Sequence, residues 1–259
     1  MPTGQAQIRA REGIEVAGAS DVGCQRENNE DSLLYWEPSD EADFQRKGRL
    51  AIVADGMGGH EGGQEASRIA TETIQHTYAA DSTPDPQSRL VKGFQQAHDK
   101  VIQYATQHLQ LRGMGTTATA LAIVGNQLYF AHIGDSRLYL IRGQEILRLT
   151  RDHSYVGRLF ENGVISAEEA EVHPQRHILT AALGTGPEIP PDTPERPILL
   201  QPTDALMLCS DGLWGVVADP DIRQIVTRNT VADACQRLID TAKQRGGPDN
   251  ITVMVLRLV

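Results

Sequence analysis

Acidic residues stand at the ends of several apolar segments of this 259-residue chain. The runs "LAIVADG", "LYFAHIGDS" and "ALMLCSDG" end at Asp55, Asp135 and Asp211, and Asp249 comes just before the run "ITVMV". An acid at a strand end is often only a turn residue, but the repetition indicates a shared role. If these strand ends converge, their carboxylates repel one another, by roughly 4 kcal/mol per pair at about 4 Å. The pattern therefore predicts a site for hard cations such as Mg2+ or Mn2+, which prefer oxygen ligands.

The sequence lacks the motifs of several other catalytic chemistries. The glycine-rich stretch "GMGGHEGGQ" is not a P-loop, because Gln64 and Glu65 stand where lysine and serine or threonine are required. Gln64 also replaces the second histidine of a zinc motif that would begin at His60. The chain has no G-x-S-x-G nucleophile elbow and no cysteine followed six residues later by arginine. Hydrolysis by metal-activated water is the chemistry that remains.

The composition is typical of a soluble globular protein, with 40% hydrophobic and 22% charged residues. The net charge of -10 argues against nucleic acid or an anionic membrane as the main partner. No apolar stretch approaches the roughly 18 residues of a spanning helix, and the first residues have no apolar signal core. The three widely spaced cysteines do not suggest a disulfide framework. We therefore expect a cytoplasmic protein.

The apolar spacing predicts strands alternating with amphipathic helices. Short segments rich in Ile, Val and Leu predict strands at 14–19, 32–36, 49–54, 117–124, 127–133, 137–142, 145–149, 204–210 and 251–258. Helical stripes run over 66–77, 90–105 and 231–242, and Gly246–Gly247 is a helix stop. The four consecutive strands within 117–149 have connections too short for crossover helices, so we expect them to pair antiparallel. The fold class is therefore mixed α+β.

The remaining segments read as a tail and insertions. Residues 1–12 look like a flexible tail ahead of a single domain at 13–259, and the polar segments 37–48 and 184–197 look like surface insertions. Residues 152–183 are mostly polar, and Ser166 with Glu169 forms a capping box that predicts a short helix.

Seven motifs, in order, carry a family resemblance: "RENNEDS", "VADGMGGHEGGQEAS", "GTTATALAI", "AHIGDSRLYLIR", "LTRDHS", "LCSDGLWGVV" and "GGPDNITVMVL". From about residue 14 to the end, the chain resembles the metal-dependent protein serine/threonine phosphatases (the PPM, or type 2C, family) in their bacterial form. The resemblance implies a four-layer α-β-β-α sandwich of two antiparallel sheets flanked by helices. It also implies that residues 152–183 are the family's flap, a variable insertion beside the active site that we expect to affect protein-substrate choice.

The resemblance also assigns roles to individual residues. The implied metal ligands are Asp55, which would bridge two ions, the carbonyl of Gly56, Asp211, Asp249 and Glu30 (directly or through water), with Asp135 and Asp211 at a third-metal site. Asp31 would hydrogen-bond a metal-bound water, and Arg26 would bind the substrate phosphate. Eukaryotic relatives carry a histidine where this chain has Met57, so the general acid is left open between His60 and metal-bound water.

These roles imply a hydrolase that removes phosphate from phosphoserine and phosphothreonine on proteins. The hypothesis is in-line attack by water bridging two Mn2+ or Mg2+ ions, in a cytoplasmic signalling enzyme that is monomeric and opposes bacterial serine/threonine kinases. Two alternatives remain: a small-molecule phosphohydrolase, and a catalytically silent regulatory module on the same fold. Loss of metal ligands is typical of silent relatives, and this chain retains every acid to which the resemblance assigns a role.

Overall fold

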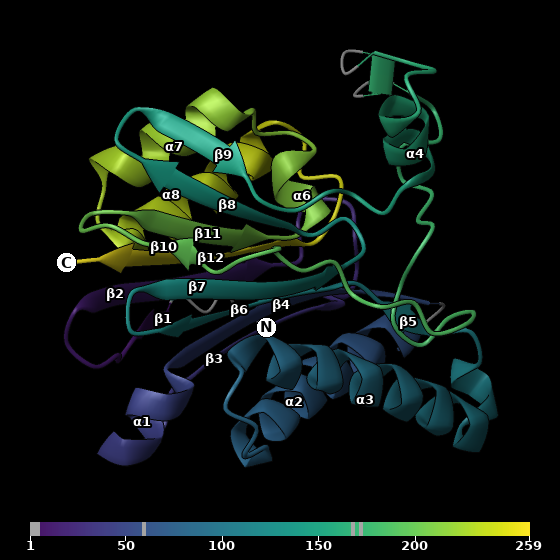
Figure 1. The fold of residues 1–259 in the computed structure, drawn as a ribbon. Helices are drawn as coiled ribbons and strands as arrows, with labels where there is room; N and C mark the ends of the chain where they lie inside the picture. Colours follow the sequence, from purple (N-terminus) through teal and green to yellow (C-terminus); the bar gives the residue numbers. More distant parts are fainter. Residues whose placement is uncertain (1–5, 59–60, 167–168, 171–172) are drawn as a thin grey trace.

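Two antiparallel sheets lie face to face and carry helices on their outer faces (Figure 1). This architecture is seen in a computed structural model that describes residues 6–58, 61–166, 169–170 and 173–259. It confirms the predicted four-layer α+β sandwich. None of the helices in these ranges is both long and apolar enough to cross a membrane.

The first sheet has six strands, four from the two ends of the chain and two from its middle. In spatial order they are β1 (Ala6–Ile8), β2 (Ile14–Asp21), β12 (Ile251–Leu258), β11 (Ala205–Cys209), β8 (Arg137–Arg142) and β9 (Glu145–Arg148). Its outer face is covered by α6 (Asp211–Trp214), α7 (Asp219–Arg228) and α8 (Val231–Gln244) (Figure 1).

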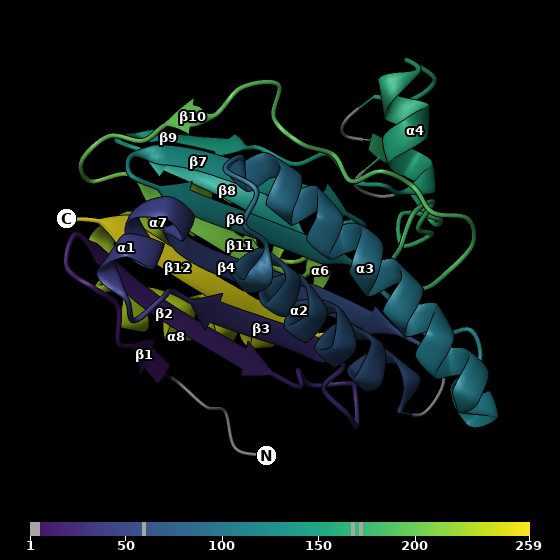
Figure 2. The same cartoon turned by 60° about the horizontal axis from the view of Figure 1, so that its bottom comes forward.

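The second sheet comes from the middle of the chain. In spatial order its strands are β10 (Ile198–Leu199), β7 (Gln127–Ile133), β6 (Ala118–Val124), β4 (Arg49–Met57) and β3 (Asp31–Trp36), and the short β5 (Gly115–Thr116) pairs with β4. Two long helices, α2 (Gly62–Ala80) and α3 (Pro86–Gln107), lie across its outer face, as Figure 2 shows.

The central strands are buried on both faces, which explains their continuous apolar runs. In β4, Leu50 and Ile52 pack toward α2 and α3, whereas Ala51 and Val53 pack in the layer between the sheets. Because successive side chains alternate between faces, Asp55 continues the second set. The strand therefore brings a carboxylate to the end of the layer between the sheets.

The three predicted helical stripes become α2, α3 and α8. All six predicted stripe residues of α8 are buried, and Thr230 caps its N-terminus by accepting a hydrogen bond from the amide of Asp233 at 3.1 Å. In α3 the stripe is shorter than predicted. It is buried as far as Val101, but the side chain of Ile102 is 38% exposed.

The short link between β7 and β8 departs from the sequence prediction. We expected the four strands within 117–149 to pair in succession, and β6–β7 and β8–β9 do pair antiparallel. However, β7 belongs to the second sheet and β8 to the first, so these two strands do not pair with each other. Residues 134–136 instead cross from one sheet to the other, because each strand finds its hydrogen-bonding partners in a different layer.

Several elements were not predicted. Strand β1 pairs with β2, so residues 6–8 are not part of a loose tail. The polar segment 37–48 contains a helix, α1 (Glu41–Lys47), whose N-cap Asp40 accepts a hydrogen bond from the amide of Asp43 at 2.9 Å. The short helix α7 was also missed, although Ile222, Ile225 and Val226 have helical spacing. The two-residue strands β5 and β10 were missed because they are too short to show an apolar period.

The segment predicted as the flap stands away from the sandwich and contains α4 (Tyr155–Glu161) (Figure 1). Its two ends pair with each other: the amide of Tyr155 donates to the carbonyl of Ile178 at 2.8 Å. The predicted capping box is present, with reciprocal bonds between Ser166 and Glu169 of 2.7 and 3.2 Å. The helix that it was expected to start includes residues outside the described ranges.

Candidate active site

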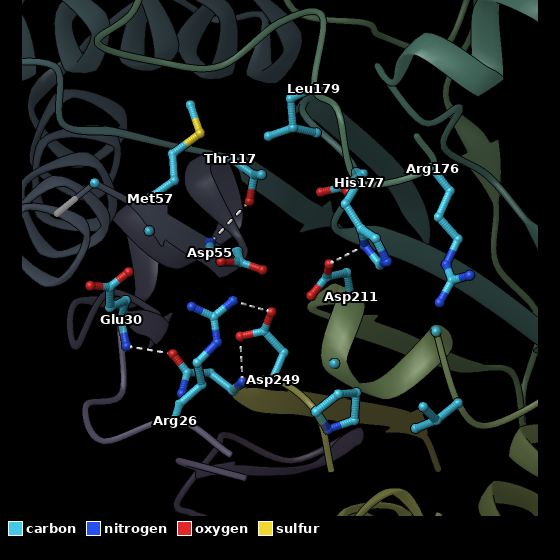
Figure 3. A pocket seen from close by; sticks show the side chains of 18 residues that line it. Arg26, Glu30, Asp55, Met57, Thr117, Arg176, His177, Leu179, Asp211 and Asp249 are labelled. Carbon is cyan, nitrogen blue, oxygen red and sulfur yellow. Dashed lines mark hydrogen bonds and ion pairs between the residues drawn. The ribbon is translucent and has the colours of Figure 1, made fainter. Parts of the chain in front are cut away.

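One pocket of about 610 Å3 opens at the edge of the sandwich where the acid-bearing strand ends meet. Seven predicted site residues line it: Arg26, Glu30, Asp55, Gly56, Asp135, Asp211 and Asp249. Arg176, His177 and Leu179 of the flap line it from the other side (Figure 3). The structure therefore gathers into one cavity acids that lie almost 220 residues apart in the sequence.

Asp55 lies near the centre of the labelled side chains in Figure 3, and its backbone is held firmly. Its amide donates to Oγ1 of Thr117 at 2.9 Å, and its carbonyl accepts from the amide of Thr117 at 2.8 Å and from Oγ1 of Thr116 at 2.9 Å. Strand β4 continues to Met57, so Asp55 lies within the strand and not after it.

Asp31 lies beside Asp55 because the two residues are paired in the register of β3 and β4. Oδ2 of Asp31 accepts a hydrogen bond from Oγ of Ser210 at 2.7 Å, across the layer between the sheets. Its other oxygen, Oδ1, is buried without a hydrogen-bond partner. Two neighbouring carboxylates therefore share a poorly solvated corner of the site.

Asp135 lies in the short link that crosses between the sheets, and its residue is only 5% exposed. Its carbonyl accepts a hydrogen bond from Nε1 of Trp214 in α6 at 2.9 Å. The ring of Trp214 stacks under the guanidinium of Arg137, whose Cζ lies 3.5 Å from the ring centroid. Arg137 in turn makes a two-point ion pair with Asp152, with bonds of 3.0 and 2.6 Å. This chain of contacts ties the link to α6 and to the start of the flap.

Asp211 is the first residue of α6, directly after β11. Its Oδ2 lies 3.7 Å from Nδ1 of His177, an ion pair whenever the imidazole is protonated (Figure 3). Its Oδ1 is buried without a hydrogen-bond partner. The flap therefore reaches over the pocket and meets the acidic cluster at Asp211.

Asp249 and Arg26 meet at the front of the pocket, from opposite ends of the chain. Nη2 of Arg26 donates to Oδ2 of Asp249 at 2.7 Å, and the Arg26 side chain is 54% exposed (Figure 3). This hydrogen bond, more than any other contact, raises the pKa of the Arg26 guanidinium. Arg26 is thus a permanent cation with free surface beside the acids.

Glu30, Gly56 and Gly63 pack closely at the start of α2. The amide of Gly56 donates to the carbonyl of Glu30 at 3.1 Å. A Cβ on Gly56 would lie 2.0 Å from the carbonyl oxygen of Gly63, and one on Gly63 would lie 2.5 Å from Oε2 of Glu30. These two glycines are therefore required for the close approach of α2 and the Glu30 loop.

Burial and mutual repulsion disfavour ionisation of the acidic cluster. Burial raises the pKa of Asp31 to about 7, although the hydroxyl of Ser210 opposes that shift. The pKa of Asp55 is raised well above its usual range by burial first and then by the charges of Asp31 and Asp211. Burial and the charge of Asp211 do the same to the pKa of Asp135. The site therefore stabilises positive charge placed among these groups.

The donor set suits a hard divalent cation: it consists of carboxylate oxygens and the carbonyl of Gly56, and Oδ1 of Asp211 is buried without a partner. As arranged, however, no three His, Cys, Asp or Glu side chains within the described ranges converge closely enough to hold an ion by themselves. Two of the acids are turned toward cationic or potentially cationic partners, Asp249 toward Arg26 and Asp211 toward His177. A bound cation would compete with these contacts.

Most predicted site residues thus lie where the sequence placed them, around one pocket. His60 lies outside the described residues, and its predicted role stays a prediction. Thr117, Arg176 and His177 also line the pocket but were not predicted as site residues. Thr117 stands in the singled-out run "GTTATALAI", whereas no local pattern marks the two flap residues.

The sandwich of two antiparallel sheets with a carboxylate-rich pocket at one edge is shared with solved bacterial serine/threonine phosphatases. The family model described as protein phosphatase 2C matches residues 25–254. The chain therefore belongs to the protein phosphatase 2C family and is a protein serine/threonine phosphatase.

Individual relatives agree with this assignment. Protein phosphatase PhpP from Streptococcus pneumoniae is 39% identical over 250 residues, which cover 95% of this chain and 98% of PhpP. The crystal structure of the Mycobacterium tuberculosis serine/threonine phosphatase PstP/Ppp superposes with a TM-score of 0.84 at 36% identity, covering 95% of this chain and 98% of that one. A second structure, the catalytic domain of PstP in complex with two manganese ions, gives 0.81 at 34% identity, with 95% and 98% coverage.

Proposed function

We propose that this phosphatase hydrolyses phosphoserine and phosphothreonine in proteins with the help of two divalent cations, Mn2+ or Mg2+. The observation that carries the proposal is the gathering of five acids around a single pocket, with Arg26 beside them. The proposed ligands are Asp55, the carbonyl of Gly56, Glu30, Asp211 and Asp249, with Asp135 available to a third ion. A PstP structure that contains two manganese ions, on a fold with a TM-score of 0.81, supports the same choice.

Bound cations would supply Lewis-acid chemistry, lowering the pKa of water and offsetting charge on phosphoryl oxygens. The chain's own residues supply orientation. Arg26 is exposed and charged, and its fork of N–H donors suits the phosphate of the substrate. Arg26 donates a hydrogen bond to Asp249. When phosphate and cations bind, Arg26 would therefore exchange Asp249 for the phosphate, and Asp249 would exchange Arg26 for a cation. Asp31, fixed by Ser210, lies where it can accept a proton from, or orient, a water beside Asp55.

The source of the proton for the leaving alcohol is a separate question. Met57, two residues after Asp55, lines the pocket, and a thioether has no proton to donate. His60 and water are the two candidates. A variant with His60→Ala separates them, because a normal rate on a phosphoester with a poor leaving group excludes His60 as the acid.

The test of the proposed function is a substrate comparison with the purified protein. We expect Mn2+-dependent release of phosphate from a phosphothreonine peptide, with much slower release from nucleotides and sugar phosphates. Preference for a nucleotide or sugar phosphate would reassign the chain to small-molecule hydrolysis, and no turnover of any phosphoester would indicate a silent module.

We also propose that the protein acts as a cytoplasmic monomer and opposes serine/threonine kinases. The naming of its relatives as serine/threonine phosphatases supports this role. Phosphoproteomes of cells with and without the active enzyme should differ at phosphoserine and phosphothreonine sites. Identical phosphoproteomes would contradict the proposal.

A further inference from the structure

Asn250, between the acid Asp249 and strand β12, is a buried residue that the proposed chemistry does not use. It is 4% exposed, and its side chain makes three hydrogen bonds, which use both N–H donors and the carbonyl oxygen. Nδ2 donates to the carbonyls of Val22 and Asn28 at 3.0 and 2.9 Å, and Oδ1 accepts from the amide of Glu30 at 2.8 Å. The three partners fix the orientation of the amide, because two are acceptors and one is a donor.

All three partners belong to one loop, residues 22–30, which carries Arg26 and Glu30. In the middle of the loop, Nδ2 of Asn250 holds the carbonyl of Asn28. Near the ends of the loop, the amide of Cys24 donates to the carbonyl of Gly247 at 2.8 Å. The middle of the loop is therefore fixed to the rest of the protein at two residues, by the bond of Asn28 to Asn250 and by the ion pair of Arg26 with Asp249.

The backbone of Asn250 is joined to the other acids of the pocket. Its amide donates to Oδ1 of Asp249 at 2.9 Å. A Cβ on Gly212 would lie 2.0 Å from the carbonyl oxygen of Asn250, so the start of α6, with Asp211, packs directly against this residue. One residue thus touches both the loop of Arg26 and Glu30 and the segments of Asp211 and Asp249.

We propose that Asn250 is a positioning residue that holds the 22–30 loop in register with Asp249, so that Arg26 meets the substrate phosphate at a fixed place. This inference rests on the proposed function, in which Arg26 binds phosphate. Truncating Asn250 leaves two loop carbonyls and one amide without their partner, and the middle of the loop loses the bond that holds the Asn28 carbonyl. Phosphate binding then weakens because the loop must be ordered when the ligand arrives.

The experiment is a double-mutant cycle between Asn250→Ala and Arg26→Ala, with Asn229→Ala as the matched control. Asn229 also donates from its amide to a backbone carbonyl, that of Ile225 at 2.8 Å, but it lies at the end of α7 outside the pocket lining. For each variant, the KM for an aryl phosphate, kcat, and the inhibition constant of inorganic phosphate are measured in Mn2+. Hydrogen exchange of the 22–30 segment is measured in the metal-free protein.

We expect Asn250→Ala to raise both KM and the phosphate inhibition constant about tenfold and to change kcat less than about threefold, a size typical of groups that orient a first-contact residue. Adding Arg26→Ala should weaken phosphate binding little further, because both changes remove the same interaction. Exchange in residues 22–30 should accelerate, and Asn229→Ala should behave like the wild type in every measurement.

Additive losses in the cycle, or unchanged KM and exchange in Asn250→Ala, would overturn the proposal. If Asn250→Ala does not fold, the cycle is repeated with Asn250→Ser, and failure of both to fold assigns Asn250 a purely structural role. Failure of the proposed function is a distinct outcome. In that case the wild type itself shows no Mn2+-dependent hydrolysis. Hydrogen exchange of residues 22–30, compared between the wild type and Asn250→Ala, still tests whether Asn250 holds the loop.

Discussion

The floor of the pocket, formed by the strand end at Asp55, and its wall, formed by the flap (residues 152–183), are built in opposite ways. On the floor, Asp55 lies within a central strand, and three hydrogen bonds to Thr116 and Thr117 hold its backbone. In the wall, helix α4 buries only Val156, and the flap exposes large apolar side chains such as Phe160 at 46% and Val164 at 66%. The floor is a continuation of the sandwich core, whereas the wall is attached mainly through its two ends.

This difference separates two tasks. Charges that stabilise a transferring phosphoryl group must be fixed before the reaction, because reorganising them costs catalysis. Protein substrates differ around the phosphorylated residue, and a loosely packed apolar surface adapts to them more readily than a strand end. We therefore expect substitutions on the floor to affect every substrate, and substitutions in the wall to affect phosphoproteins selectively.

The largest effect is expected on the floor. Asp55→Ala should lower kcat/KM for both an aryl phosphate and a phosphopeptide by about three orders of magnitude, since it removes the proposed central ligand. Asp240→Ala is a matched control, because Asp240 is an exposed acid on α8 that accepts a hydrogen bond from Gln236 and does not line the pocket. Turnover within a few-fold of the wild type in Asp55→Ala would refute the metal-site assignment.

A smaller floor effect tests how the backbone of Asp55 is held. Thr117→Val keeps the shape but removes the hydroxyl that accepts from the Asp55 amide and bonds Oγ of Ser136 at 2.8 Å. We expect kcat to fall about tenfold on both substrates. Thr106→Val, on α3, removes a comparable hydroxyl bond and should leave kcat unchanged. Equal rates in the two variants would show that Asp55 does not need this bond.

The wall should give a selective effect of about three- to fivefold. The double variant Phe160→Ser and Val164→Ser removes exposed apolar contact area, so kcat/KM should fall on phosphoproteins but not on aryl phosphate. Leu147→Ser with Leu199→Ser is the control, because these side chains are 57% and 61% exposed on the edge strands β9 and β10. Equal losses on both substrates in the flap variant would remove the distinction between floor and wall.

The floor also has a stability consequence of a few degrees in melting temperature. Burial raises the pKa of Asp31 from 3.8 to about 7. Its contribution to the stability of the metal-free fold is therefore fully present below pH 3.8 and is lost as pH rises through about 7. In EDTA, the melting temperature of Asp31→Asn should fall less between pH 5 and 8 than that of the wild type, which retains this carboxyl. Parallel curves of melting temperature against pH for the two proteins would show that Asp31 does not cause this loss of stability.

The sequence predicted what depends on local pattern. Apolar runs located nine strands, and their terminal acids predicted the pocket, because a strand carries its last residues to a sheet edge. The crossing of residues 134–136 was not predictable, since a short connection does not reveal which sheet receives the next strand. Arg176 and His177 were missed for a similar reason: only the three-dimensional path of the flap brings them over Asp211.

The crossing of residues 134–136 joins the two sheets at the edge that holds the acids. Packed sheets lie about 10 Å apart, and only three residues separate the end of β7 from the start of β8, so the chain there has little slack. The link therefore fixes the separation of the two sheets at the edge where Asp135 lies. An insertion or deletion within residues 134–136 would shift Asp135 relative to the other acids, whereas volume-conserving substitutions in the cores would leave it in place.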